Sequence, residues 1–236
     1  MKTTTKKVIL GVLVVTTVIL GALFLVRNND TYKTSSEANP TNNLKESESV
    51  TGTKIIAIGD SLTAGYGLEL KDSYPNILEE KLKNDGYNVS VINAGISGET
   101  TAGLLDRVSF ILKQKPEIVL ITIGGNDAFR NLPLENTREN ILQIASLLKK
   151  DIAPNKIFLM RVQAPENLGI NYKRDFDSIY EEVAEKEGVT LVQFVEPEVF
   201  LNNKYIQSDG IHPNGLGYKQ IVDQYIYPAI TEVLIK

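Results

Sequence analysis

Residues 54–65 read KIIAIGDSLTAG, a short apolar run that ends in a glycine and passes directly into small polar residues. The apolar part, 54–59, has the length and composition of a buried strand. Four further runs have the same character: 88–93 (NVSVIN), 117–124 (EIVLITIG), 156–162 (KIFLMRV) and 190–195 (TLVQFV). The sequence therefore predicts five short strands.

Segments with helical periodicity separate these strands. Large apolar residues recur at helical spacing within 74–82, 104–112, 141–148 and 176–183, and a last helix is expected from about Asn214, with Pro228 kinking or interrupting it. Strands that alternate with helices predict an α/β protein with a five-stranded parallel sheet and helices on both faces. Ligands of such sheets bind beyond the carboxyl ends of the strands, so a site is expected in the turns that follow the strands.

The composition excludes several classes of site. The chain has 236 residues, 42% of them hydrophobic, which suits one substantial core, and its net charge of −4 gives no basic excess for nucleic acid. The absence of cysteine excludes disulfides, thiolate metal ligands and a cysteine nucleophile, and a single histidine, His212, argues against a catalytic zinc. We expect no metal and no cofactor, although a calcium site made of carboxylates alone stays open.

The N-terminal segment has the features of a membrane anchor. Residues 8–26 (VILGVLVVTTVILGALFLV) are 19 residues without a charge, long enough to span a bilayer as one helix. Lys2, Lys6 and Lys7 precede this run, so residues 1–7 are expected in the cytoplasm and the rest of the chain outside. The run is longer than the apolar part of a signal peptide and lacks a small-x-small cleavage pattern. We expect a single-pass anchor in the cell membrane; a cleaved signal peptide, and hence a secreted protein, is the alternative.

The segment after the anchor is polar. Residues 27–52 are dominated by Ser, Thr, Asn and Glu and contain almost no large apolar side chains. Such a segment cannot offset the entropy of its own ordering, so a flexible tether is expected. The alternating pattern begins at residue 53, which places the globular domain at 53–236.

Small-residue turns with a polar group follow the first three strands, and another turn of this kind lies near the C-terminus. These turns contain Ser61, Gly98, Asn126, Asp209 and His212. Each turn also has a purely structural explanation, since glycines make tight turns, the Asn-Asp pair at 126–127 can cap a helix and the Asp-Gly pair at 209–210 is a common turn.

Taken together, the five residues predict nucleophilic catalysis. The hydroxyl of Ser61 needs a base to remove its proton, and His212 is the only imidazole in the chain. Asp209 lies three residues before that histidine, close enough to hold the ring in the useful tautomer. A bare N–H at Gly98 and the amide of Asn126 can donate to an oxyanion. The serine does not lie in a G-x-S-x-G elbow, which argues against an α/β-hydrolase.

The blocks that contain these residues resemble those of the GDSL or SGNH hydrolases, and the resemblance covers about residues 53–236. The matching blocks are GDSL (59–62), ISGET (96–100), GGND (124–127) and DGIHPN (209–214). The resemblance is closest to bacterial multifunctional esterases described as acyl-CoA thioesterase, lysophospholipase and arylesterase, although Glu99 stands where the family more often has Asp. It implies a flavodoxin-like three-layer α/β/α sandwich and a carboxylic ester hydrolase that needs no cofactor.

The resemblance also implies a role for each site residue. Ser61 would be the nucleophile of a triad with Asp209 and His212. The N–H groups of Ser61 and Gly98 and the side-chain amide of Asn126 would form the oxyanion hole. The loop after the third block would border the acyl chain of the substrate, and Phe129, Leu132 and Leu134 are the candidates to line it; packing of one or two of them in the core is the alternative.

The natural ester is less well defined by the sequence. Thioesters stay open, but an outward-facing enzyme meets little acyl-CoA, so lipid esters or acylated surface glycans fit the expected location better. Two alternatives remain: a carbohydrate O-acetylesterase or O-acyltransferase on the same scaffold, and a membrane-anchored binding module with a dead site. The complete set of five site residues argues against the second alternative. The sequence gives no indication of the oligomeric state.

Overall fold

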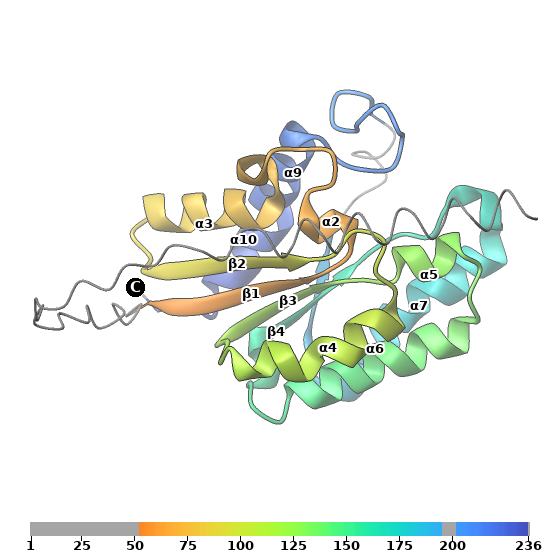
Figure 1. The fold of residues 1–236 in the computed structure, drawn as a ribbon, viewed down its shortest axis with the longest axis horizontal. Helices are drawn as coiled ribbons and strands as arrows, with labels where there is room; N and C mark the ends of the chain where they lie inside the picture. Colours follow the sequence, from red (N-terminus) through yellow and green to blue (C-terminus); the bar gives the residue numbers. More distant parts are fainter. Residues whose placement is uncertain (1–51, 195–201, 236) are drawn as a thin grey trace, which may run out of the picture. The chain divides into compact units, whose positions relative to one another are not determined.

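A computed structural model of the chain describes residues 52–194 and 202–235. Its sheet has five parallel strands in the order β2-β1-β3-β4-β5 (Figure 1). This is the flavodoxin-like order, in which the chain direction across the sheet reverses between β1 and β3. The strands are β1 (Thr53–Gly59), β2 (Val89–Gly95), β3 (Ile118–Thr122), β4 (Ile157–Arg161) and β5 (Thr190–Gln193). The predicted parallel sheet is therefore confirmed.

Helices cover both faces of this sheet (Figure 1). One face is covered by α4 (Thr101–Lys113), α6 (Leu134–Leu148) and α7 (Ile170–Glu187), and the other by α3 (Tyr74–Asn84), α9 (Gly215–Ile221) and α10 (Tyr227–Thr231). Successive side chains of β1 point to opposite faces of the sheet. Ile56 and Ile58 therefore pack with the first set of helices, and Ile55 and Ala57 pack with the second.

The ends of several strands differ from the predicted ends. The strand expected at 88–93 continues to Gly95, because β2 pairs with β1 along its whole length. The strand expected at 117–124 is only Ile118–Thr122, because Gly124 has a φ of 116° and turns the chain into a helix. The strand expected at 190–195 ends at Gln193, and Val195 lies outside the described residues.

Two single-turn helices stand where the sequence predicts only turns. They are α2 (Ser61–Ala64), directly after β1, and α5 (Gly125–Phe129), directly after β3. Gly59 allows the chain to enter α2 beside β3: its φ is 146°, and a Cβ at this position would lie 1.9 Å from the carbonyl oxygen of Thr122. Only glycine fits here. Because β1 and β3 are paired neighbours, α2 and α5, which follow them, both lie at the carboxyl edge of the sheet.

The C-terminal helix is interrupted before Pro228, as predicted. A π-helical segment (Val222–Ile226) separates α9 from α10, and Pro228 lies in the first turn of α10. Proline has no N–H to donate to the carbonyl four residues earlier, and the wider π turn accommodates that loss. The residues on either side remain in the core, since Ile221, Val222 and Ile226 are fully buried.

The N-terminal predictions concern residues that the structure does not describe. The cytoplasmic segment 1–7, the anchor 8–26 and all of the tether 27–52 except Gly52 lie outside the described residues. Among the helices of residues 52–194 and 202–235, none combines the length and the apolar character that a membrane span requires.

Candidate active site

Ser61, His212 and Asp209 form a continuous chain of hydrogen-bonding groups at the carboxyl edge of the sheet. Nε2 of His212 lies 2.9 Å from Oγ of Ser61, and Nδ1 of the same ring lies 2.7 Å from Oδ2 of Asp209. An ionised carboxylate can only accept, so Nδ1 carries the proton and Nε2 is left as an acceptor facing the serine hydroxyl. The predicted association of the three side chains is present, across 151 residues of sequence.

Backbone groups hold Asp209 in the orientation that this chain needs. Its Oδ1 accepts hydrogen bonds from the N–H groups of Ile211 and His212, at 2.9 and 3.0 Å. Burial alone would raise the pKa of the Asp209 carboxyl, but these two donors and the imidazole outweigh it and hold the pKa below its ordinary value. The carboxylate is therefore ionised near neutral pH and acts as an acceptor for the histidine.

The loop that contains His212 is held against the first catalytic segment. The ring centroid of Tyr66 lies 4.9 Å from that of His212. The side-chain amide of Gln207 donates to the carbonyl oxygens of Tyr66 and Pro213, at 2.8 and 3.0 Å. Tyr66 and Gln207 were not among the predicted site residues, because a residue that fixes a loop has no characteristic sequence pattern.

The two predicted oxyanion donors lie in the segments that follow β2 and β3, the strands on either side of β1. Gly98 follows β2, with a φ of 82° that favours glycine, and the turn is tied to β1 because Ile96 N–H donates to the carbonyl of Gly59 at 2.8 Å. Asn126 lies in α5, the short helix that follows β3. The three segments that carry Ser61, Gly98 and Asn126 therefore follow three adjacent strands of the sheet, β1, β2 and β3.

Asp60 connects the serine turn to α5. Its carboxylate is almost fully buried; Oδ1 accepts the N–H of Leu62 at 2.9 Å, and the group is also hydrogen-bonded to the side chain of Asn126. Burial raises the pKa of Asp60 to about 7, despite these two donors. Sequence reasoning missed this role, although an acid between a buried strand and the candidate nucleophile was a usable signal of a buried, paired carboxylate.

Asp127 connects α5 to α4. Its buried carboxylate accepts the N–H of Thr101 at 2.9 Å and the hydroxyl of Thr101 at 2.6 Å. Asn140, on α6, donates to the same hydroxyl at 3.0 Å. The helix-cap alternative for residues 126–127 is thus correct for Asp127, but the helix end that it satisfies is that of α4 rather than α5.

The Gly98 turn has two arginine contacts. Arg107, on α4, donates to both carboxylate oxygens of Glu99 at 2.6 Å and to the carbonyl of Ala94 at 2.8 Å. Arg130, which follows α5, donates to the carbonyl of Gly98 at 2.8 Å. The Glu99 side chain therefore forms a bidentate ion pair that holds the turn, and Arg130 joins the segments that carry the two predicted oxyanion donors.

The three residues expected to border an acyl chain differ in exposure. Phe129 is 55% exposed, at the end of α5. Leu132 and Leu134 are partly buried, and Leu134 packs against the core beneath α6. Phe129 is the one of the three that is most available to a ligand.

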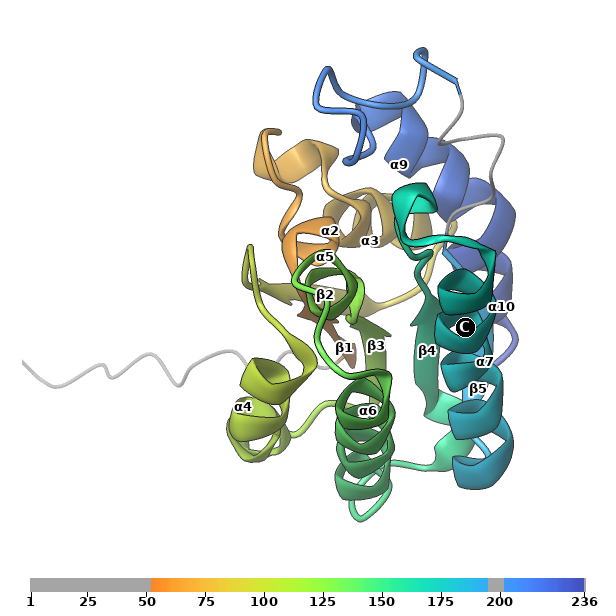
Figure 2. The same ribbon diagram turned by 90° about the vertical axis from the view of Figure 1, so that its right-hand side faces the viewer.

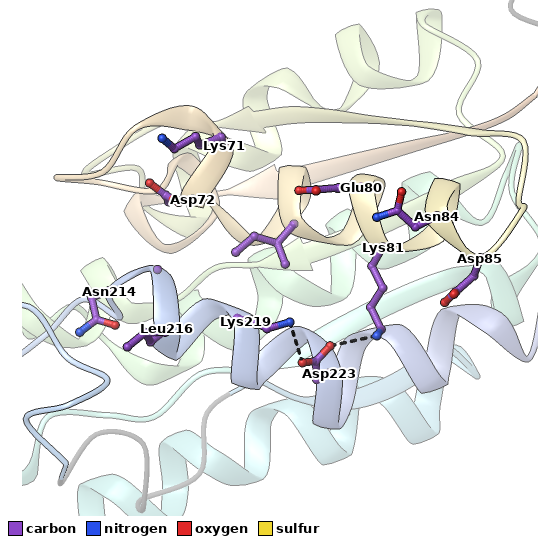
Figure 3. A pocket seen from close by; sticks show the side chains of 12 residues that line it. Lys71, Asp72, Glu80, Lys81, Asn84, Asp85, Asn214, Leu216, Lys219 and Asp223 are labelled. Carbon is purple, nitrogen blue, oxygen red and sulfur yellow. Dashed lines mark ion pairs between the residues drawn. The ribbon is translucent and has the colours of Figure 1, made fainter.

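A separate open cleft lies between α3 and α9 (Figure 3). Its volume is about 750 Å³, and its charged residues largely neutralise one another: Asp223 pairs with Lys81 at 3.2 Å and with Lys219 at 3.3 Å. None of the candidate catalytic residues lines it. Within residues 52–194 and 202–235, no three His, Asp or Glu side chains cluster in a way that could hold a metal ion.

Comparisons with known proteins agree with this arrangement. Residues 57–220 match the GDSL-like lipase/acylhydrolase family. The chain is 36% identical to an arylesterase of Vibrio mimicus, over 78% of this chain and 88% of that protein. It is 37% identical to thioesterase 1/protease 1/lysophospholipase L1 of Escherichia coli K12, over 68% and 75%. The crystal structure of TesA superposes with a TM-score of 0.72 at 31% identity, covering 77% of this chain and all of that one.

Proposed function

The chain belongs to the GDSL-like lipase/acylhydrolase family and is a serine esterase, and we propose that Ser61 is its nucleophile, His212 its general base and Asp209 the residue that orients that base. The observation that carries the proposal is the unbroken contact from Ser61 through the imidazole to Asp209, with the proton-accepting nitrogen 2.9 Å from the serine hydroxyl. This is the geometry that proton removal from a serine requires.

The reaction has two acyl-transfer steps. His212 takes the proton of Ser61 as Oγ bonds to the carbonyl carbon of the ester, and the protonated ring then gives that proton to the departing alcohol oxygen. A water molecule, deprotonated by the same ring, attacks the acyl-enzyme and releases the acid, and Oγ regains its proton. Asp209 stabilises the imidazolium that forms twice in this cycle.

The oxyanion of each tetrahedral intermediate needs donors that are already in place. We assign this role to the N–H groups of Ser61 and Gly98 and to the side-chain amide of Asn126. The support is positional: the donors lie in the segments that follow three adjacent strands at one edge of the sheet, and buried carboxylates fix the segment that carries Asn126. Donors held in this way do not have to reorganise as charge develops.

Covalent trapping tests the assignment of the nucleophile. An aryl phosphonate ester should inactivate the enzyme and leave one phosphonyl group on Ser61, which peptide mass spectrometry would locate. Ser61→Ala should carry no adduct and should hydrolyse 4-nitrophenyl acetate no faster than the buffer does. An adduct on another serine, or turnover by Ser61→Ala, would refute the assignment.

We further propose that the enzyme is anchored by residues 8–26 with its catalytic domain outside the cytoplasm, and that its substrates are ester lipids. The uncharged run of 19 residues and the lysines before it support the anchor. One relative is named as a lysophospholipase. Phe129, which is exposed at the end of the helix that carries Asn126, is suited to contact an acyl chain.

A further inference from the structure

Solvent-exposed large hydrophobic side chains concentrate at the catalytic edge of the sheet. Among the described residues, nine such side chains are more than a third exposed, and two of them, Phe110 and Ile235, lie away from this edge. The other seven lie in the turns and helix starts that follow the carboxyl ends of the strands. These seven, which we call the apolar rim, are Tyr66, Leu70, Ile96, Phe129, Ile170, Ile211 and Leu216.

The inner members of the rim lie in the segments that carry the candidate catalytic residues. The ring of Tyr66 packs on His212, and Ile211 is the residue before that histidine. Ile96 precedes the Gly98 turn by two residues, and Phe129 ends the helix that carries Asn126. Each is between 38% and 55% exposed, so apolar surface borders the catalytic groups from four separate segments.

The outer members lie farther round the same edge, which faces the viewer in Figure 2. Leu70 lies in the 3₁₀ turn before α3, Leu216 in the first turn of α9, and Ile170 is the first residue of α7. The first two segments lie close together, because a Cβ placed on Gly215 would be 3.4 Å from Cβ of Asp72. The outer members are 69%, 55% and 80% exposed, and they have no part in the proposed mechanism.

We propose that the apolar rim docks the catalytic edge onto the surface of a phospholipid bilayer, so that ester lipids pass from the bilayer directly to Ser61; this rests on the proposed esterase function. Apolar groups distributed over several segments of one edge can all be buried at once by an apolar phase that covers the whole edge. A single peptide would cover only one line of them. Water-exposed apolar side chains gathered at one place mark an interaction surface of this kind.

The segment between the proposed anchor and the domain is long enough for this docking. The segment 27–52 has 26 residues and joins the domain at Thr53, the amino end of β1, opposite the catalytic edge. β1 has 7 residues and is about 23 Å long. A chain of 26 residues can span up to about 90 Å, so a domain anchored through residues 8–26 can still turn its far edge toward the same membrane.

Lipid contact can be measured without turnover, because the chain has no native cysteine to compete for a label. The full chain with Ser61→Ala and either Leu70→Cys or Phe110→Cys would carry an environment-sensitive fluorophore and be reconstituted in phosphatidylcholine vesicles. Brominated lipids should quench the label at position 70 and leave the label at position 110 unquenched. Equal quenching at the two positions, or none at position 70, would overturn the proposal.

Activity gives the second measurement, with a control matched in number and exposure. Leu70→Ser with Ile170→Ser should lower the rate on lysophosphatidylcholine carried in the vesicles by about tenfold. Phe110→Ser with Ile235→Ser, at 63% and 92% exposure in the wild type, should leave that rate unchanged. Both double variants should hydrolyse water-soluble 4-nitrophenyl acetate at the wild-type rate.

The outcomes separate this proposal from the esterase assignment. If the two double variants lower the vesicle rate equally, or neither does, docking through the rim fails while the esterase function stands. If the rim variant instead dissociates a dimer in light scattering and keeps its vesicle rate, the rim is a contact between two copies and the proposal is wrong. Absence of 4-nitrophenyl acetate hydrolysis by the unmodified chain would contradict the esterase function itself.

Discussion

The proposed catalytic side chains are oriented by buried or backbone partners rather than by one another alone. Asp209 receives two backbone N–H groups before it contacts the imidazole, and Asp60 holds the side chain of Asn126. Ser61, Gly98, Asn126, Asp209 and His212 could be named from the sequence because each chemistry needs a particular residue type. The residues that orient them could not be named from the sequence, because many side chains of suitable length can make an orienting hydrogen bond.

Asn126 should contribute to rate rather than to stability. Asn126→Ala removes one oxyanion donor, which acts mainly on charge that develops in the transition state. We expect kcat to fall by about 10²–10³ with little change in KM. Steady-state kinetics on an aryl ester would measure this, with the melting temperature as the control. A large fall in melting temperature would show instead that the amide is mainly structural.

Asp60 should give the protein a pH-dependent stability. Its pKa is raised from 3.8 to about 7 by burial, so the folded state binds a proton that the unfolded state releases between these two values. The folded protein therefore loses stability as pH rises from about 4 to about 7, and the penalty is complete above pH 7. Asp60→Asn cannot ionise and should lack this contribution. Urea unfolding of both proteins across this range should show the wild type losing stability relative to Asp60→Asn; a constant difference would contradict the prediction.

At the scale of elements, α5 connects the parts of the site. It follows β3, and its residues contact the serine turn through Asp60, α4 through Asp127 and the Gly98 turn through the adjacent Arg130. A single turn of helix could not be predicted from periodicity, which needs a longer window to be detected. The long helices and all five strands could be predicted, because their apolar spacing extends over several turns or the whole strand.

Asp127 should stabilise the junction between α5 and α4. Asp127→Ala leaves the N–H and hydroxyl of Thr101 without this acceptor in a buried place, which should cost about 1–3 kcal/mol in the free energy of unfolding. Activity should fall as well, because Thr101 follows the Gly98 turn. Urea titration would measure the stability, with Asp106→Ala, on the exposed face of α4, as the control. Equal effects of the two substitutions would show that the junction contributes nothing.

At the scale of the molecule, the parallel sheet determines which distant residues meet. The side chains of Ser61 and His212, 151 residues apart, come within 2.9 Å because α2, directly after β1, and the loop before α9 lie at the same edge of the sheet. The rule that sites lie at the carboxyl ends of strands predicted this edge from the sequence. The exposure of the apolar rim could not be predicted, since an apolar residue in a turn is buried or exposed according to the packing around it.

The domain should fold and work without the segment that precedes it. Among the described residues, the side chains between Ile55 and Leu234 form two apolar cores, so the fragment 53–236 should unfold cooperatively and hydrolyse a soluble ester at the full-length rate. Protease added to intact cells should release the same fragment by cutting within 27–52. Loss of cooperative unfolding in the fragment would place the domain boundary elsewhere, and activity in the medium from a chain lacking 1–26 would indicate a cleaved signal peptide.

The most direct test of the account is removal of its only imidazole. The chain contains one histidine and no cysteine, so acylation and deacylation must share His212 if the triad is correct. His212→Ala should lower kcat roughly 10⁴–10⁶-fold on an aryl ester while the unfolding midpoint stays near that of the wild type. Adding Ser61→Ala should cost little more, because the two residues act as a unit. Turnover by His212→Ala close to the wild-type rate would contradict the triad and leave Ser61 without an activating base.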